Sequence, residues 1–263
     1  MAHTIYENQV LENRIDSILT TAIDMNAYMT IDNSLTHEAG MKKAIHVYTC
    51  SDALAVEDLA MGQGNSTEIE LYFDTVEYEV ATTQGKFSYF DEQEMKDPMV
   101  VEVGLKAIAE NMTNDLTSKA IAEFDKATLT QTYTGSGLTF DNVVDAIAKL
   151  NTEDESGLFL LINTADKAGL RKNLGDDLKY SEGFARTGYI GSVCGVPVIV
   201  SKAVPNGKAY LATKEAVTCF VKKGSEIEQE RNADIRKNDV FARKVMLVAL
   251  TDKTKVVKFT KSA

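Results

Sequence analysis

The sequence predicts a mixed fold of helices and strands, in the α/β (α+β) class, and three patterns carry this prediction. Residues 158–162 form a short apolar run of the length expected for a strand buried on both faces, and residues 196–200 form a second. Apolar residues with helical spacing continue from residue 98 to residue 124. Residues 68–80 alternate apolar and acidic side chains, which is typical of a half-exposed strand. The chain therefore combines buried strands, an exposed strand and one long helix.

The N-terminal segment, residues 1–43, is expected to form an arm with one amphipathic helix. Leu11, Ile15, Ile18 and Ala22 fall at i, i+4, i+7 and i+11, so they lie on one face of a helix. This apolar stripe must be buried, either against the core of the same chain or against a neighbouring copy.

An extended two-stranded β-hairpin is expected within residues 44–93. A strand at residues 44–49 is followed by a polar loop and then by the alternating run. The alternation slips by one residue after Asp74, which indicates a β-bulge or a change of strand partner. Because an isolated two-stranded hairpin is marginally stable in water, this one needs a partner surface.

The long helix is expected to begin after Asp97, a good N-cap, with Pro98 in its first turn. A helix of roughly 28 residues that ends near Phe124 would be about 42 Å long. Residues 134–137 form a short link, and Thr139 is placed to cap a second helix that continues to Leu150.

The second half of the chain is expected to contain a compact α/β unit and then further strands. Thr164 is a plausible cap for a short helix after the strand at residues 158–162. A charge-rich segment, residues 224–239, separates two of the later runs. The strands expected after residue 205 are 209–212, 216–221, 240–250 and 254–259.

Composition excludes several classes of protein. The chain has 263 residues, of which 44% are hydrophobic and 25% are charged, as in ordinary soluble globular proteins. No apolar run reaches the roughly 20 residues that a membrane-spanning helix needs. The N-terminus lacks the basic leader and apolar block of a signal peptide, so we expect no secretion.

The net charge of −11 is unevenly distributed along the chain. Residues 1–126 carry 8 Lys and Arg against 23 Asp and Glu, whereas residues 127–263 carry 20 against 16. An acidic first half argues against a nucleic-acid-binding module, which needs clustered Lys and Arg. Two interpretations remain: a solvated acidic surface, or halves of opposite charge that attract one another between copies of the chain.

Reactive side chains do not form a recognisable catalytic or metal site. The three histidines, His3, His37 and His46, lie in the first fifth of the chain and lack the spacing of a metal-ligand pair. The sequence also lacks the Ser elbow and downstream His of a hydrolase triad. The cysteines are expected to be reduced thiols without metal-ligand spacing; they are Cys50, Cys194 and Cys219.

A glycine-rich segment precedes the strand at residues 196–200. Gly188, Gly191 and Gly195 do not have the G-x-G-x-x-G spacing, and they lead into a strand instead of a helix. We therefore expect neither a dinucleotide site nor a bound cofactor. Close backbone packing near a symmetry axis and a plain loop are the two remaining interpretations.

The order of these segments resembles that of the major capsid proteins of tailed double-stranded DNA bacteriophages, which have the HK97-like fold. The glycine-rich segment and the G-V-P-V-I-V-S strand at residues 195–201 resemble the axial (A) domain of that family. Residues 226–250 resemble the closing strands of its peripheral (P) domain. The resemblance implies an arm at 1–43, an E-loop hairpin at 44–93, a P domain with a spine helix at 94–133 and 206–263, and an A domain at 134–205.

The resemblance also implies a function. Copies would form pentamers and hexamers of an icosahedral head that encloses double-stranded DNA without sequence-specific binding. The protein would lie in the virion after assembly in the host cytoplasm, with no enzymatic activity, metal, cofactor or membrane contact. Its main partner would be itself, and scaffolding, portal and decoration proteins are further candidates. Inter-subunit contacts are expected at Leu11, Ile15, Ile18, Glu57, Gly62, Gly64, Glu68, Glu70, Glu77, Gly188, Gly191 and Gly195.

Two features refine this expectation. The best-known member of the family forms a covalent link from a hairpin lysine, but residues 57–66 contain no lysine, so a noncovalent shell is expected. The arm is shorter than the scaffolding segment that some relatives fuse to their N-terminus. Assembly is therefore expected to be guided by a separate scaffolding protein or by none.

Two other functions remain open on the sequence. The first is an encapsulin, a cargo-loading shell protein with the same fold. The second is a cytosolic α/β enzyme or ligand-binding domain with a site built from Asp, Tyr and backbone groups, which would leave the long hairpin unexplained.

Overall fold

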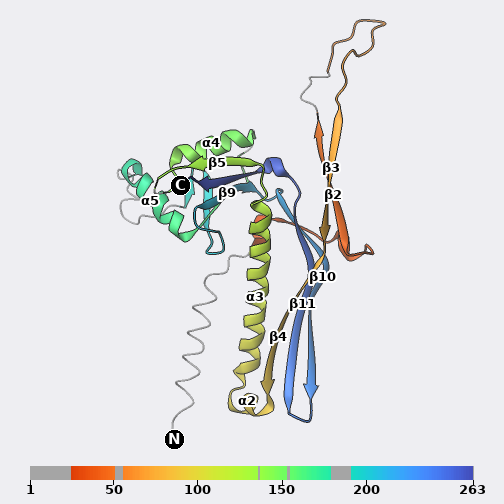
Figure 1. The fold of residues 1–263 in the computed structure, drawn as a ribbon, viewed down its shortest axis with the longest axis vertical. Coiled ribbons are helices and arrows are strands. Elements are labelled where there is room, and N and C mark those ends of the chain that lie inside the picture. The colour runs from red at the N-terminus through yellow and green to blue at the C-terminus, as the bar shows by residue number, and fades with distance from the viewer. Residues whose placement is uncertain (1–24, 51–55, 136, 153–154, 179–190, 263) are drawn as a thin grey trace.

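The computed structural model describes residues 25–50, 56–135, 137–152, 155–178 and 191–262. They form three connected parts (Figure 1). A two-stranded hairpin projects away from the rest of the molecule. A four-stranded sheet lies along one long helix, and a six-stranded sheet with two helices lies at the C-terminal end of that helix (Figure 1).

The projecting hairpin consists of β2 (Lys42–Cys50) and β3 (Leu71–Glu79). The two strands pair antiparallel in one unbroken register, from Lys42 opposite Glu79 to Cys50 opposite Leu71. The bulge predicted after Asp74 is therefore absent. The change of partner occurs at Val80, after which the chain continues as β4 (Ala81–Phe90) in the four-stranded sheet.

The slip in alternation has a different physical cause from the one predicted. Near the base of the hairpin, Val76 and Tyr78 are half-buried, and Tyr78 packs against the apolar cluster of the body. Farther out, Leu71 and Phe73 lie on the opposite face, because strand side chains alternate, and they are exposed. The apolar face thus changes along the hairpin while the strand pairing stays regular.

The four-stranded sheet has the order β1–β10–β11–β4. Its long strands β10 (Val217–Asn232) and β11 (Lys237–Leu250) form a hairpin, and β1 (Thr30–Asp32) pairs parallel with β10. The charge-rich segment at residues 224–239 was expected to separate two strands, but it forms the end of β10, the turn and the start of β11. Arg243 Nε lies 2.8 Å from a Glu226 carboxylate oxygen across the pair, so opposite charges support the exposed strands.

The long helix α3 (Met99–Phe124) packs on this sheet and follows the short helix α2 (Asp91–Lys96). The Met99 backbone N–H donates to Asp97 Oδ1 at 3.0 Å, which confirms the predicted helix start. Most buried side chains lie in the C-terminal half of α3, whereas Ile108 is the one buried side chain before Leu116. The N-terminal half is therefore less covered.

The six-stranded sheet has the order β5–β12–β9–β6–β8–β7. Thr139 caps α4 as predicted, because its Oγ1 accepts from the Asn142 backbone N–H at 3.3 Å. At α5 the cap lies one residue earlier than predicted, since Asn163 Oδ1 accepts from the Ala165 N–H at 2.9 Å. The elements of this part are β5 (Leu129–Tyr133), α4 (Phe140–Leu150), β6 (Leu158–Ile162), α5 (Thr164–Leu178), β7 (Ser192–Val193), β8 (Val196–Val200), β9 (Lys208–Thr213) and β12 (Val256–Lys261).

Three strands, β5, β9 and β12, lie in the same sheet as β6 and β8, which fall in the range 134–205. All three fall in the ranges 94–133 and 206–263, which were assigned to the P domain with the spine helix. Strand β9 pairs with both β6 and β12, and β12 also pairs with β5, so all three belong to the six-stranded sheet. Apolar content identifies a buried strand but does not identify its partner, which is why the sequence did not show this assignment.

Three apolar clusters hold the parts together. The first joins the end of α3 to both sheets and to the 3-10 helix η1 (Met25–Tyr28). The second lies between the six-stranded sheet and α4. The third lies at the base of the projecting hairpin and includes Leu35 and Val80, near the 3-10 helix η2 (Ser34–Thr36). A third 3-10 helix, η3 (Lys253–Lys255), leads into β12.

The contact between α3 and β4 yields a stability prediction. A Cβ atom at Gly85 would lie 2.8 Å from Ile108 Cγ2, on a buried helix side chain. We expect Gly85→Ala to lower the free energy of unfolding by about 1–3 kcal/mol, because helix and strand must separate to admit the methyl group. Chemical denaturation of the purified chain measures this.

Gly224→Ala is the matched control, because Gly224 lies in β10 of the same sheet and a Cβ there meets no atom within 4 Å. It should leave the unfolding midpoint unchanged or raise it slightly. Equal effects of the two substitutions on the unfolding midpoint would show that the close approach of β4 to α3 does not determine the loss of stability.

Candidate assembly surfaces

The described residues contain no arrangement that points to a metal or membrane site. Within these ranges, no group of three His, Cys, Asp or Glu side chains is placed to hold a metal ion. None of the helices in the described part of the chain is both long and apolar enough to span a membrane. Cys194 and Cys219 are free thiols, and burial raises the pKa of each above its ordinary value, which keeps both protonated.

The most conspicuous surface is the outer part of the β2–β3 hairpin and its loop. Leu71 and Phe73 are 68% and 64% exposed, and Tyr72 on the other face is 56% exposed. Large exposed apolar side chains that cluster on a projecting element are typical of an interaction surface. Further exposed apolar side chains on this segment are Val56, Leu59, Met61 and Ile69.

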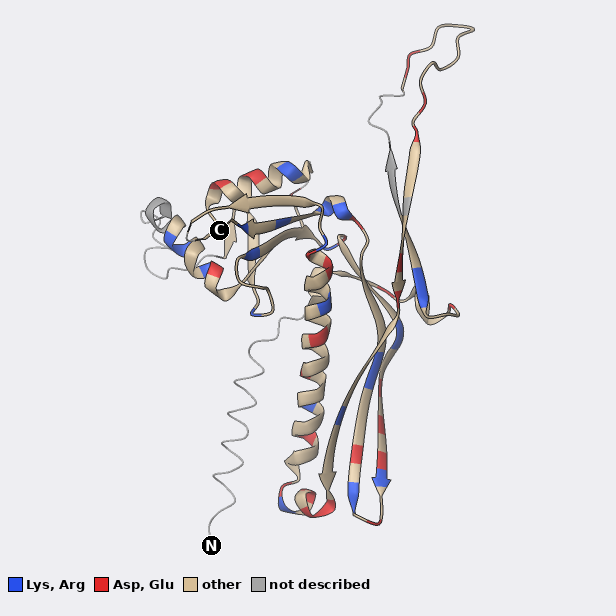
Figure 2. Cartoon of the chain, viewed as in Figure 1, with Lys and Arg blue, Asp and Glu red and all other residues tan. Residues whose placement is uncertain are grey.

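The same segment carries charge of one sign. Residues 44–85 contain eight Asp and Glu and no Lys or Arg. Figure 2 shows acidic residues along the hairpin and basic ones at its base, where Lys42 lies 3.2 Å from Glu79. Glu68, Glu70 and Glu77, which were predicted contact residues, are exposed on this segment. A complementary surface must therefore be apolar with a basic rim.

The loop of the hairpin is closed by Glu57. Its carboxylate accepts hydrogen bonds from the Ser66 backbone N–H at 3.0 Å, from Ser66 Oγ at 2.6 Å and from Thr67 Oγ1 at 2.6 Å. The side-chain hydrogen bonds from Ser66 and Thr67 lower the pKa of Glu57 to about 2. Glu57, a predicted contact residue, therefore shapes the loop within its own chain.

Two predicted glycines also lie in the hairpin loop. Gly62 has a φ of +88°, which favours glycine, and it lies within the turn that is closed by the Gln63 N–H, which donates to Ala60 O at 3.0 Å. Gly64 is exposed, and a Cβ atom added to it would meet no atom within 4 Å, so its surroundings place no steric demand on it.

The predicted glycine-rich segment is described only from Gly191 onward. Cys194 and Gly195 have φ angles of +52° and +80° and form the two-residue turn between β7 and β8. Gly191 O accepts from the Val198 N–H at 2.9 Å. The predicted contact residues Leu11, Ile15, Ile18 and Gly188 lie outside the described residues.

Sequence reasoning missed the anchor at the base of the hairpin. Glu123 of α3 accepts from Lys126 Nζ at 2.6 Å and from the Leu250 N–H at 3.3 Å. Lys126 Nζ in turn lies 5.2 Å from the centroid of the Tyr78 ring in β3. Burial, and then the nearby Glu123 charge, raise the pKa of Tyr78. No spacing pattern links these residues, since the contacts join a helix, a hairpin and a distant strand.

The low pKa of Glu57 gives a prediction with a defined sign. A lowered carboxyl pKa means that loop closure is fully present above the ordinary value of 4.5 and is lost as the pH falls through about 2. The Glu57 carboxyl carbon, followed by NMR, should therefore titrate near 2. Glu57→Ala should remove the hydrogen-exchange protection of the Ser66 amide at neutral pH.

Asp58→Ala removes the neighbouring exposed carboxylate and serves as the control. It should leave the Ser66 amide protected. Titration of Glu57 near its ordinary value, or equal protection in both variants, would contradict the proposed closure.

Comparisons with known proteins identify the family of this chain. The sequence profile of a phage capsid protein family matches residues 73–259. A curated relative, the "Major capsid protein" of Staphylococcus phage phiMR11, is 30% identical over 128 residues, which are 45% of this chain and 44% of that protein. The match thus spans less than half the length of the curated relative.

Solved structures match over most of the chain. A chain from Mycobacterium phage Che8 has a TM-score of 0.67 at 17% identity and covers 90% of both chains. The capsid of Ralstonia phage GP4 has a TM-score of 0.69 at 9% identity and covers 92% of both chains. These likenesses confirm the predicted HK97-like fold.

The family match supports the predicted phage capsid protein and favours it over an encapsulin, whereas the structural neighbours, at 17% and 9% identity, show the shared fold alone. The chain belongs to the phage capsid protein family.

Proposed function

We propose that copies of this capsid protein form pentamers and hexamers that close into the icosahedral head of a tailed phage around double-stranded DNA. The observation that carries the proposal is the projecting β2–β3 hairpin, whose outer apolar side chains stay exposed in a single chain. A thin hairpin of this kind gains stability when it lies on another surface. In a closed symmetric assembly every copy provides that surface for a neighbour.

The contacts of the hairpin follow from its chemistry. Ile69, Leu71 and Phe73 would be buried on the adjacent copy, while Glu68, Glu70 and Glu77 would meet a basic rim and set the register. Gly62, with Glu57, would set the shape of the loop that reaches the neighbour, and Gly64 would lie on the exposed surface of that loop.

The other parts have roles in the same assembly. The unit of α3 with the four-stranded sheet corresponds to the P domain, and the six-stranded sheet with α4 and α5 to the A domain. Gly188, Gly191 and Gly195 would lie near a symmetry axis, where the tight β7–β8 turn keeps the backbone close. The role proposed for the chain is structural and not catalytic.

Assembly would take place in the host cytoplasm through noncovalent contacts. Portal and decoration proteins are the expected partners of the finished shell, and a scaffolding protein, if one is required, would be a separate chain. Expression of this chain without any other phage protein decides that point, because correctly sized shells would exclude a required scaffold.

The hairpin contact is tested with Ile69→Thr combined with Leu71→Thr, which keeps strand propensity and removes apolar area. Each buried methylene group contributes about 0.8 kcal/mol, so the two changes should weaken each contact by roughly 2–3 kcal/mol. This raises the concentration needed for assembly at least tenfold. Electron microscopy and size-exclusion chromatography measure the assembled fraction.

Val144→Thr on α4 is the matched control, since Val144 is also exposed and aliphatic but lies far from the hairpin (Figure 1). It should assemble like the parent chain. The unassembled hairpin variant should keep the melting temperature of the parent chain. If that variant nevertheless assembles normally, the hairpin contact does not contribute to assembly and the proposed mechanism is wrong.

A further inference from the structure

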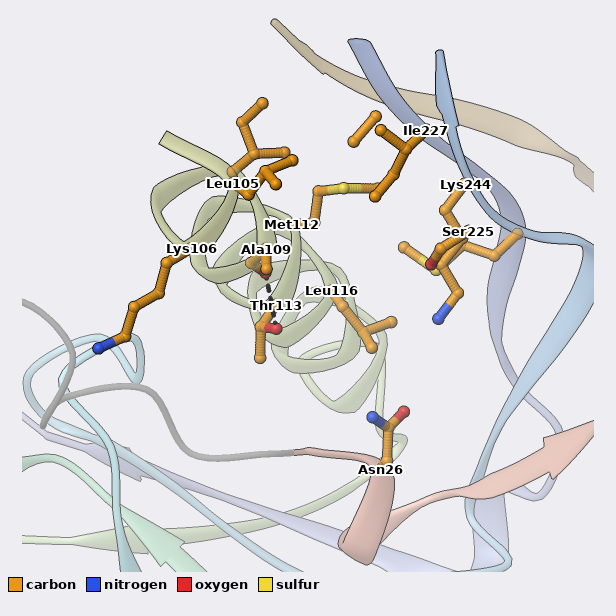
Figure 3. Close-up of a pocket in the computed structure, with 13 residues that line it drawn as sticks. Asn26, Leu105, Lys106, Ala109, Met112, Thr113, Leu116, Ser225, Ile227 and Lys244 are labelled. Carbon is orange, nitrogen blue, oxygen red and sulfur yellow. Dashed lines mark hydrogen bonds between the residues drawn. The ribbon is translucent and has the colours of Figure 1, made fainter. Parts of the chain in front are cut away.

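An apolar groove lies between the N-terminal half of α3 and the strands β10 and β11. Its volume is about 490 Å³. Leu105, Ile108 and Met112 of α3 line one wall, and Ile227 and Met246 of the strands line the other. Met112 extends across the groove toward Ile227 (Figure 3). The groove therefore has the apolar lining of a site for a helix or strand.

The groove is incompletely filled by the described residues. Ile227 is 64% exposed, although it faces a helix across the groove. Leu105 and Met112 are only half-buried, whereas the large apolar side chains of α3 from Leu116 onward are buried. An amphipathic helix normally covers its apolar stripe along the whole length, so this part of α3 needs a further partner.

The chain itself enters the groove at one end. Asn26 lines the groove near Leu116 (Figure 3). Its neighbours Met25 and Met29 are 0% and 3% exposed and belong to the cluster at the end of α3. The polypeptide immediately before Met25 therefore leaves from a fixed point at the edge of the groove.

We propose that residues 11–22 of the same chain dock as a helix into this groove, parallel to α3. Their apolar stripe has the right length: Leu11 and Ala22 are eleven residues apart, as are Leu105 and Leu116. At 1.5 Å per residue each stripe spans about 16 Å. A helix that runs back from Met25 would bring Ala22 near Leu116 and Leu11 near Leu105.

The charges at the groove agree with this occupant on one side of the seam. Lys106 and Lys244 line the groove, and Glu12 and Asp16 follow one side of the apolar stripe of residues 11–22, with Arg14 on the other side. Opposite charges beside an apolar seam favour one register of two packed helices. The contact lies within one chain, so it does not rest on shell formation.

Paired cysteines test the docking. In the unassembled chain, Ile18→Cys with Met112→Cys places both thiols within the groove at the same level of the proposed register, and mild oxidation should link them. Thr20→Cys with Met112→Cys is the control, because Thr20 is two residues from Ile18 and would lie on the opposite face of the same helix. We expect at least tenfold more disulfide linkage in the test pair than in the control pair, measured by mass spectrometry of the linked peptides.

A mixture of isotopically labelled and unlabelled chains identifies the occupant. The proposal is supported if each disulfide joins two peptides that carry the same label, because both cysteines then come from one chain. Links between labels would overturn it, because they would show the arm of a second copy in the groove. Equal linkage in the test and control pairs would also overturn it and would leave the groove to another segment, such as the hairpin loop of a neighbour.

A second measurement does not depend on oxidation. Ile15→Glu with Ile18→Glu should displace the helix and increase the fluorescence of an apolar dye several-fold, because the groove becomes open. Asn13→Glu with Thr20→Glu adds the same charge to the opposite face and should leave the dye signal unchanged. Equal signals from both variants would contradict the docking.

Discussion

The structure depends on the C-terminal end of α3, where two sheets meet one helix. The Phe124 ring is fully buried and contacts the rings of Phe159 and Tyr210, with centroids 6.1 Å and 6.0 Å away. The same cluster contains residues from the four-stranded sheet, among them Val217 and Val248. Removal of apolar area at this point would therefore loosen both sheets together.

A polar group at the next residue fixes the orientation of this joint. Asp125 accepts from Lys208 Nζ at 2.9 Å and from Tyr210 Oη at 3.2 Å, and Lys258 Nζ lies 3.8 Å away. Burial alone would raise the pKa of Asp125, but the hydrogen bond and charge of Lys208 and the charge of Lys258 outweigh it and lower the pKa. Apolar packing joins the parts, and directional bonds to β9 and β12 set the angle between them.

Local elements were predictable because their signals are local. The start of α3 at Asp97, the Thr139 cap and the buried strand at residues 158–162 each follow from adjacent residues. The sheet to which each strand belongs was not predictable. The apolar sequences of β9 and β12 would suit pairing with β6 and equally well pairing with β11. The phase slip after Asp74 was visible, but its cause, a change in which face is covered, depends on the body of the molecule.

The candidate surface was predictable to a similar extent. Acidic alternation and the need for a partner indicated the hairpin, and exposure confirms that its outer residues are uncovered in one chain. Glu57 was expected at a contact but is engaged by Ser66 and Thr67, because hydrogen bonds within a loop cannot be read from composition. The anchor at Tyr78, Glu123 and Lys126 was invisible for the same reason: its members are far apart in the chain.

The continuity of β3 and β4 has a mechanical consequence. One buried residue, Val80, separates the strand that pairs within the hairpin from the strand that packs on α3. No flexible linker separates the two strands, so a movement of the hairpin would pivot at Val80. In the proposed assembly, a neighbour that pulls the tip would load β4 directly and, through the close approach of Gly85 to Ile108, would also load the long helix. Curvature imposed at the rim of one copy would thereby be passed to the centre of the next.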